Sequence, residues 1–195
     1  MIPMIVGSID LPSLDVVVHR MAKRYASIRT YRDHFQVWDV LGKHRELIGD
    51  GSFEVEPPKQ FRFVLRRFHL DEKITVEQDR SGRRYLTPVR LGRGRRYSDR
   101  ADLDESPPIH STPFEVVSLI LGKPGARDQL VGRETISREV VDGRPCFRLS
   151  THERLRDDYV WLDAKTYLIV KIRACSHGKI DFDQVYRFHP RAVWR

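Results

Sequence analysis

Apolar residues recur at every second position through most of this chain, in short segments that end at glycine, proline or aspartate. Such alternation is typical of antiparallel strands that pack one face against a core and expose the other face to water. Turn residues between the segments, such as the Asp142-Gly143 pair, favour hairpins. We predict strands over residues 31–40, 52–56, 61–68, 73–78, 83–91, 95–97, 131–141, 144–150, 159–162, 167–173 and 180–188.

Two segments interrupt this alternation with helical spacing. Apolar residues three, four and seven positions apart follow Pro12-Ser13 and predict an amphipathic helix over residues 13–30. A second helix begins with Thr112-Pro-Phe-Glu115, a capping box with proline at the first helical position, and stops at Gly122 and Pro124. A sheet of about ten strands coils rather than staying flat. We therefore predict an α+β, mainly β fold: a strongly curved antiparallel sheet, or incomplete barrel, wrapped around two short helices.

The chain length favours one domain. At 195 residues the chain can bury one substantial core, so we expect a single domain over residues 1–195, with residues 1–12 disordered or left from a signal sequence. No apolar stretch reaches the roughly 18 residues needed to span a bilayer. The first residues lack the basic region of a signal peptide. The residues alone therefore do not identify the compartment, and the cytoplasm stays open. We expect the protein to be a monomer.

Patterns typical of cofactor, metal or catalytic sites are missing from the sequence. Cys146 and Cys175 fall two strands apart in the predicted meander, about 10 Å at best, so we expect two free thiols. The eight histidines include no His-x-x-x-His pair. The chain also contains neither a phosphate-binding lysine loop nor a Gly-x-Ser-x-Gly elbow. We expect no cofactor, no metal and no catalytic residue.

The net charge of +8 is concentrated in one segment. Eight arginines stand between residues 80 and 100 against one acid, Asp99. Such a strip predicts an anionic membrane surface or an acidic protein as partner, unless its arginines are only the solvated face of two strands. Nucleic acid is less favoured, because Tyr85 and Tyr97 offer stacking rings without any nucleic-acid-binding signature. The expected docking surface comprises Arg83, Arg84, Arg90, Arg93, Arg95 and Arg96.

A curved sheet covered by only two short helices is difficult to fill, so the space between them is a natural site for an apolar ligand. The same apolar positions form a core by default, and that interpretation stays open for each of them. The residues that we expect to face this cavity are Met21, Tyr25, Phe61, Phe63, Leu65, Phe114, Val117, Leu121, Phe147, Leu149, Leu168 and Val170.

Several segments carry a family resemblance through their order and spacing: Tyr25–Tyr31, Gly51–Phe63, Ser111–Phe114, Val141–Leu149 and Val160–Ile169. Together they extend over most of the chain. This order resembles the bacterial outer-membrane lipoprotein-carrier superfamily, which includes LolA, LolB and lipoprotein-sorting relatives. The resemblance implies an incomplete barrel with a helical lid, a cavity for acyl chains, and a place in the cell envelope or periplasm.

These features favour a non-enzymatic binding or carrier protein. It would hold an apolar ligand, such as an acyl chain, a lipid or a lipoprotein, between the sheet and the helices. One alternative is a small-molecule biosynthetic enzyme on the same fold, with a residue such as His34, Glu54, Arg62 or Tyr159 at the cavity mouth. Another is a nucleic-acid or anionic-surface binder that acts through residues 80–100.

Overall fold

The structure is a computed structural model that describes residues 11–58, 60–81, 83–90, 101–102, 112–123, 125, 134–154, 156–177 and 181–194. Its helices are α1 (Leu14–Ala26) and α2 (Thr112–Ile120). Its strands are β1 (Ile28–Leu41), β2 (His44–Glu56), β3 (Gln60–Arg67), β4 (Glu72–Gln78), β5 (Arg84–Arg90), β6 (Ala101–Asp102), β7 (Thr135–Val141), β8 (Arg144–Glu153), β9 (Arg156–Asp163), β10 (Ile169–His177), β11 (Asp181–Phe188) and β12 (Arg191–Trp194).

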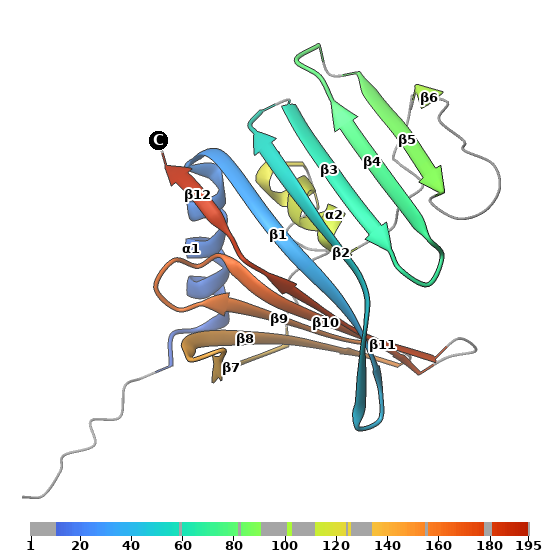
Figure 1. Ribbon diagram of the computed structural model, residues 1–195. Helices are drawn as coiled ribbons and strands as arrows, with labels where there is room; N and C mark the ends of the chain where they lie inside the picture. The colour runs from blue at the N-terminus through green and yellow to red at the C-terminus, as the bar shows by residue number, and fades with distance from the viewer. Residues whose placement is uncertain are drawn as a thin grey trace, which may run out of the picture.

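All these strands belong to one antiparallel sheet. Its order is β6-β5-β4-β3-β2-β1-β11-β10-β9-β8-β7, and β12 pairs with the first part of β1. Figure 1 shows the sheet bending between its β1–β5 half and its β7–β11 half. Both helices contribute to the core that this bend encloses. Among the described strands β6 and β7 end the order without meeting, so the barrel is incomplete and the predicted fold class is confirmed.

Helix α1 is shorter than the sequence pattern suggests. The side chain of Ser13 accepts a hydrogen bond from the first turn, as serine commonly does at this position. The predicted helix end at residue 30 is wrong, because the helix stops at Ala26 and Ser27 closes its last turn. Ile28 then starts β1, in keeping with the preference of β-branched residues for strands. In the described part of the chain, no helix has the length and apolarity to cross a membrane.

Helix α2 begins at Thr112, as the capping box predicts, and Gly122 follows it with a left-handed φ of +68°. The helix buries more than one side of its circumference. A helix that is apolar on most sides is one that is covered on most sides. Its buried side chains include Val116, Val117, Leu119 and Ile120.

The strands differ from the predicted ones mainly where alternation is absent. Strand β2 starts at His44 rather than residue 52, because β1 and β2 continue their pairing as far as Leu41 and His44. The sequence pattern predicts neither β12 nor the two-residue β6. The predicted strand 95–97 lies outside the described residues.

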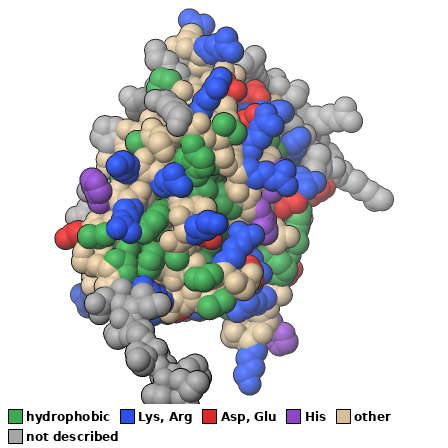
Figure 2. Space-filling model, turned by 90° about the vertical axis from the view of Figure 1, so that its left-hand side faces the viewer, with side chains coloured by type: hydrophobic (Ala, Val, Ile, Leu, Met, Phe, Trp, Pro, Cys, Tyr) green, Lys and Arg blue, Asp and Glu red, His purple; other side chains and the backbone are tan. Residues whose placement is uncertain are grey.

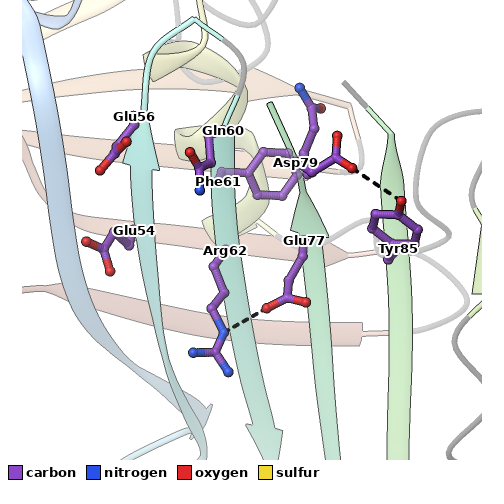
Figure 3. Close-up of a pocket in the computed structure, with 9 residues that line it drawn as sticks. Glu54, Glu56, Gln60, Phe61, Arg62, Glu77, Asp79 and Tyr85 are labelled. Atoms are coloured by element: carbon purple, nitrogen blue, oxygen red, sulfur yellow. Dashed lines mark hydrogen bonds and ion pairs between the residues drawn. The ribbon is translucent and has the colours of Figure 1, made fainter. Parts of the chain in front are cut away.

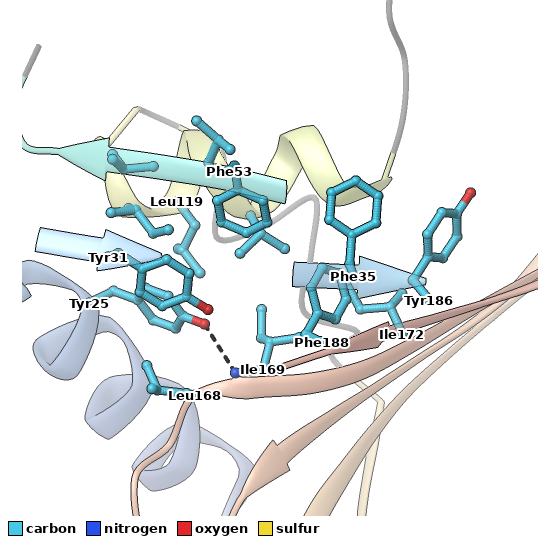
Figure 4. Packing of buried hydrophobic residues seen from close by; sticks show 14 of the residues in the cluster. Tyr25, Tyr31, Phe35, Phe53, Leu119, Leu168, Ile169, Ile172, Tyr186 and Phe188 are labelled. Atoms are coloured by element: carbon cyan, nitrogen blue, oxygen red, sulfur yellow. Dashed lines mark hydrogen bonds between the residues drawn. The ribbon is translucent and has the colours of Figure 1, made fainter. Parts of the chain in front are cut away.

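Aromatic rings fill much of the concave side of the sheet (Figure 4). Tyr31 stacks on Phe53 with ring centroids 5.5 Å apart. The centroid of the Phe35 ring lies 5.7 Å from that of Phe63 and 6.1 Å from that of Phe188. Pairs of this kind add about 0.5–1.5 kcal/mol beyond the burial of their area. The space that the bent sheet encloses is therefore largely filled by a packed core.

Candidate functional site

One pocket lies where Pro113, at the start of α2, faces β1, β2, β3 and β11. Its volume is ≈ 270 Å³, close to the lower end of the roughly 300–1,000 Å³ found for ligand pockets. Three polar residues, Arg67, His69 and Gln184, contribute to its lining. The apolar walls are formed by Val37, Ile48, Leu65, Leu70, Pro113 and Tyr186.

Strand pairing brings these walls together from distant parts of the chain. Val37 lies opposite Tyr186 in the β1–β11 ladder and opposite Gly49 in the β1–β2 ladder. Gly49 in turn lies opposite Arg67 of β3. A Cβ atom at Gly49 would meet the backbone oxygen of Arg66 at 2.5 Å. Glycine is therefore required there for β2 and β3 to approach each other.

The charged and polar groups of the pocket lie toward its rim. The Arg67 guanidinium is 3.6 Å from the Glu72 carboxylate. The Tyr186 hydroxyl donates a hydrogen bond to Gln184 Oε1 at 2.7 Å. Leu70 is 49% exposed and continues the apolar wall into solvent. An apolar interior with a cation at its edge suits an amphiphile, whose chain enters the pocket while an anionic group stays beside Arg67.

The residues expected at the cavity mostly lie in one packed cluster. Leu121 is partly buried against this cluster, and the side chain of Phe114 lies outside the described residues. Among the expected residues whose side chains the structure describes, only Leu65 also lines the pocket beside Pro113. The expected residues that belong to this cluster are each no more than 5% exposed, and they are Met21, Tyr25, Phe61, Phe63, Leu65, Val117, Phe147, Leu149 and Leu168.

Val170 departs from the expected arrangement. Strict alternation would place Leu168, Val170 and Ile172 on one face, but the β9–β10 register shifts between Ile169 and Lys171. Such a bulge changes which residues point inward. Leu168, Ile169 and Ile172 therefore join the main core, whereas Val170 packs with Cys146 and Trp161 in a separate cluster. Val170 is thus removed from the set that faces the helices.

A carboxylate is buried in the core near the end of α1. Asp33 is 2% exposed and occupies an inward position of β1. The Tyr31 hydroxyl donates to Asp33 Oδ2 at 2.8 Å, and the His189 backbone N–H donates to Oδ1 at 2.7 Å. Burial raises the pKa of Asp33 to about 7, although these hydrogen bonds oppose the shift. Burial also raises the pKa of Tyr31 well above its ordinary value.

This carboxylate belongs to a set of hydrogen bonds that joins four elements. The Tyr25 hydroxyl, on the last turn of α1, accepts a hydrogen bond from the Ile169 N–H of β10 at 3.0 Å. The Tyr25 and Tyr31 rings lie 6.2 Å apart. Asp33 then connects β1 to the turn between β11 and β12 through His189. This group of residues was not predicted. Its signal in the sequence is a charged residue, Asp33, at an inward position between Tyr31 and Phe35.

A second pocket, shown in Figure 3, lies beside β2–β5 and has a volume of ≈ 360 Å³. Its charged groups pair across neighbouring strands. Arg62 Nε is 3.0 Å from Glu77 Oε1, and the Tyr85 hydroxyl donates to Asp79 Oδ2 at 3.3 Å. The Ser81 hydroxyl lowers the pKa of Asp79. At this strand surface the carboxylates of Glu77 and Asp79 are therefore already engaged by the protein.

The residues considered for catalysis lie on the convex face. His34 and Glu54 alternate with the inward-facing Phe35 and Phe53, and Glu54 accepts a hydrogen bond from Arg32 at 2.7 Å. Arg62 pairs with Glu77 on the same face. The Tyr159 ring packs beside Trp161 in the separate cluster. The structure therefore places none of His34, Glu54, Arg62 and Tyr159 in the lining of the concave pocket.

The predicted basic docking surface is described only in small part. Arg83 is exposed at the start of β5. The side chains of Arg84 and Arg90 lie outside the described residues, as do Arg93, Arg95 and Arg96 entirely. The docking role of this surface stays a prediction.

Both cysteines are free, as predicted, and both are buried. Burial raises the pKa of Cys146, and it raises the pKa of Cys175 to about 11. Within the described ranges, no three His, Cys, Asp or Glu side chains gather in a group that could hold a metal ion.

Comparisons with known proteins found similarity at the level of structure. No protein-family model matches the chain, and no curated protein matches it. The structure is similar to the lipoprotein LppX of Mycobacterium tuberculosis, at 10% identity over 92% of this chain and 95% of LppX, with a TM-score of 0.47. It is also similar to a LolA superfamily protein from Nitrosomonas europaea, at 8% identity over 95% of this chain and 94% of that one, with a TM-score of 0.40.

A third similar structure is a chain of the Pseudomonas aeruginosa MucA/MucB complex, at 16% identity and a TM-score of 0.45. The match covers 92% of this chain and 58% of that one. LolA superfamily proteins, which the sequence resembles, are thus among the solved structures to which this chain is similar. At these identities the likeness concerns the fold.

Proposed function

We propose that this protein is a non-enzymatic binding or carrier protein for an amphiphile with an acyl chain. The pocket beside Pro113 is the observation on which the proposal rests, because it combines apolar walls with the cation of Arg67 at its rim. The chain would lie against Val37, Ile48 and Leu65, and an anionic group would remain near Arg67. The sequence resemblance implies that this work takes place in the bacterial envelope, which stays a prediction.

Binding of a fluorescent long-chain fatty acid tests the proposal, with Val37→Phe as the informative variant. Val37 is only 6% exposed and borders the pocket, so the larger ring should occupy the volume of ≈ 270 Å³ that the probe needs. We expect at least a tenfold loss of affinity, because excluding even two methylene groups costs about 1.6 kcal/mol. The measurement is a fluorescence titration in high salt, where apolar binding persists.

The matched control is Val140→Phe, because Val140 is 71% exposed on β7 and takes the same change in side chain. It should bind the probe as the natural protein does. Equal losses in the two variants, or undiminished binding in a folded Val37→Phe protein, would refute the pocket as the binding site. Circular dichroism checks that both variants remain folded.

The role of Arg67 is tested by comparing the fatty acid with the corresponding fatty alcohol. Arg67→Gln should weaken binding of the acid about two- to fivefold, in line with a partly exposed charge pair worth up to about 1 kcal/mol. Binding of the alcohol should be unchanged, because it carries no charge to meet the guanidinium. An equal loss for both probes would mean that Arg67 acts through packing and not through its charge.

A further inference from the structure

Helix α1 presents an outward face that its packing in the core leaves in contact with water. Its buried residues are Val17, Met21 and Tyr25, which share one side of the helix. Val16, Arg20 and Lys23 follow one another at intervals of four and three, and therefore share an exposed side of the helix, away from Met21 and Tyr25. Val16 is 40% exposed, and Arg20 and Lys23 are exposed as well. This outward face thus mixes an aliphatic residue with cations.

The surroundings of this face repeat the same mixture. Figure 2 views the side of the molecule that carries α1 and shows Lys and Arg side chains interspersed with exposed apolar ones. Leu11 is 41% exposed just before the helix. Arg24 completes the last turn of α1, whereas Asp15 is the acid of its first turn. The charge balance of the helix is therefore positive.

Two of these cations are held in place by aromatic rings. Arg20 Nη1 donates a hydrogen bond to the Tyr167 hydroxyl at 2.8 Å, and its guanidinium carbon lies 5.8 Å from the ring centre. The Arg24 guanidinium carbon lies 4.3 Å from the centre of the Trp194 ring. Such contacts order long side chains that would otherwise move freely, so less entropy is lost when the same cations meet an anionic surface.

We infer that the outward face of α1, defined by Leu11, Val16, Arg20 and Lys23, docks on an anionic lipid surface. Interfaces between proteins are depleted in lysine, whereas Lys23 is exposed on this face. Here the neighbouring rings are already covered by arginines, and exposed aliphatic residues alternate with cations. Cations at the headgroup level with short aliphatic side chains inserted beside them are typical of peripheral membrane binding. The inference is independent of the apolar pocket.

Sedimentation of the full chain with lipid vesicles tests the inference. The protein should bind vesicles of phosphatidylcholine with phosphatidylglycerol, release from them as salt is raised, and not bind vesicles of phosphatidylcholine alone. Lys23→Glu should weaken binding at least tenfold, because it reverses one charge at a surface where each cation contributes substantially. Val16→Ser should weaken binding by a smaller factor.

The matched control is Lys43→Glu, the same charge reversal at an exposed position in the turn between β1 and β2. We expect it to change binding less than twofold. Failure of the natural protein to bind the anionic vesicles would overturn the inference. A loss with Lys43→Glu as large as that with Lys23→Glu would also overturn it, since the docking face would then lie elsewhere or be non-specific. Lys23→Glu should still bind a soluble fatty-acid probe, which separates this inference from the pocket.

Discussion

Replacing Gly51 by alanine should destabilise the protein by about 3 kcal/mol, at the upper end of the cost of overpacking a core. A Cβ atom at this position would collide with the Val64 backbone oxygen and with the Phe35 ring, both closer than real Cβ atoms approach. The backbone oxygen belongs to the β2–β3 ladder, so it cannot move without breaking strand pairing. The Phe35 ring is also confined, because it packs against Phe53 and Phe63. Urea denaturation measures the change in the free energy of unfolding.

Gly42→Ala is the control for this substitution. Gly42 has a φ of +64°, and a Cβ atom there would meet nothing within 4 Å. The expected cost is about 1 kcal/mol, which reflects the left-handed backbone alone. If Gly51→Ala proved no more harmful than Gly42→Ala, the close packing of Phe35 over β2 would be wrong, and with it the packed interior beside the pocket.

Asp33→Asn should change how stability depends on pH. In the unfolded chain the Asp33 carboxyl has its ordinary pKa of 3.8, whereas burial raises its pKa to about 7 in the folded protein. The folded state therefore holds the proton more tightly between these values, so the natural protein loses stability as pH rises through this window. The asparagine variant has no such loss. Between pH 4 and pH 8 its free energy of unfolding should rise by about 4 kcal/mol relative to that of the natural protein, at about 1.4 kcal/mol per pKa unit.

The structure also explains why asparagine should be tolerated. Its Oδ1 can accept from the His189 N–H, and the Tyr31 hydroxyl can rotate to accept from its amide. Asp183→Asn is the control, and its stability should depend on pH in the opposite direction, because hydrogen bonding to Arg173 lowers the pKa of Asp183. That variant should lose stability relative to the natural protein as pH rises through the acid range. A stability difference between Asp33→Asn and the natural protein that does not vary with pH would show that Asp33 is not buried as a titrating group.

Local signals in the sequence are sufficient for much of the fold. The capping box places the start of α2 at Thr112, and the Asp142-Gly143 turn places the β7–β8 hairpin. The four-residue β12 escapes prediction because its pairing with β1 depends on contacts between the two ends of the chain. Val170 is misplaced because a bulge shifts the inward positions without any mark in the residue pattern.

The candidate site was harder to predict than the fold. Val37 and Tyr186 are inward residues of their strands, but they meet only because β1 pairs with β11. Phe63, one of the aromatic residues proposed for the cavity, is instead packed against Phe35 and Phe53. Since sequence patterns specify which face a residue occupies and not what fills that face, the pocket could be located only with the sheet order known.

Photo-cross-linking with a diazirine-bearing fatty acid tests the central proposal most directly. Mass spectrometry then identifies the labelled residues in the natural protein. We predict label on Val37, Ile48, Leu65 and Leu70, the residues that line the pocket beside Pro113, and loss of that label when unlabelled fatty acid competes. Label confined to convex-face residues such as Glu54, Arg62 and Glu77, or label that competitor does not displace, would contradict a ligand site on the concave side.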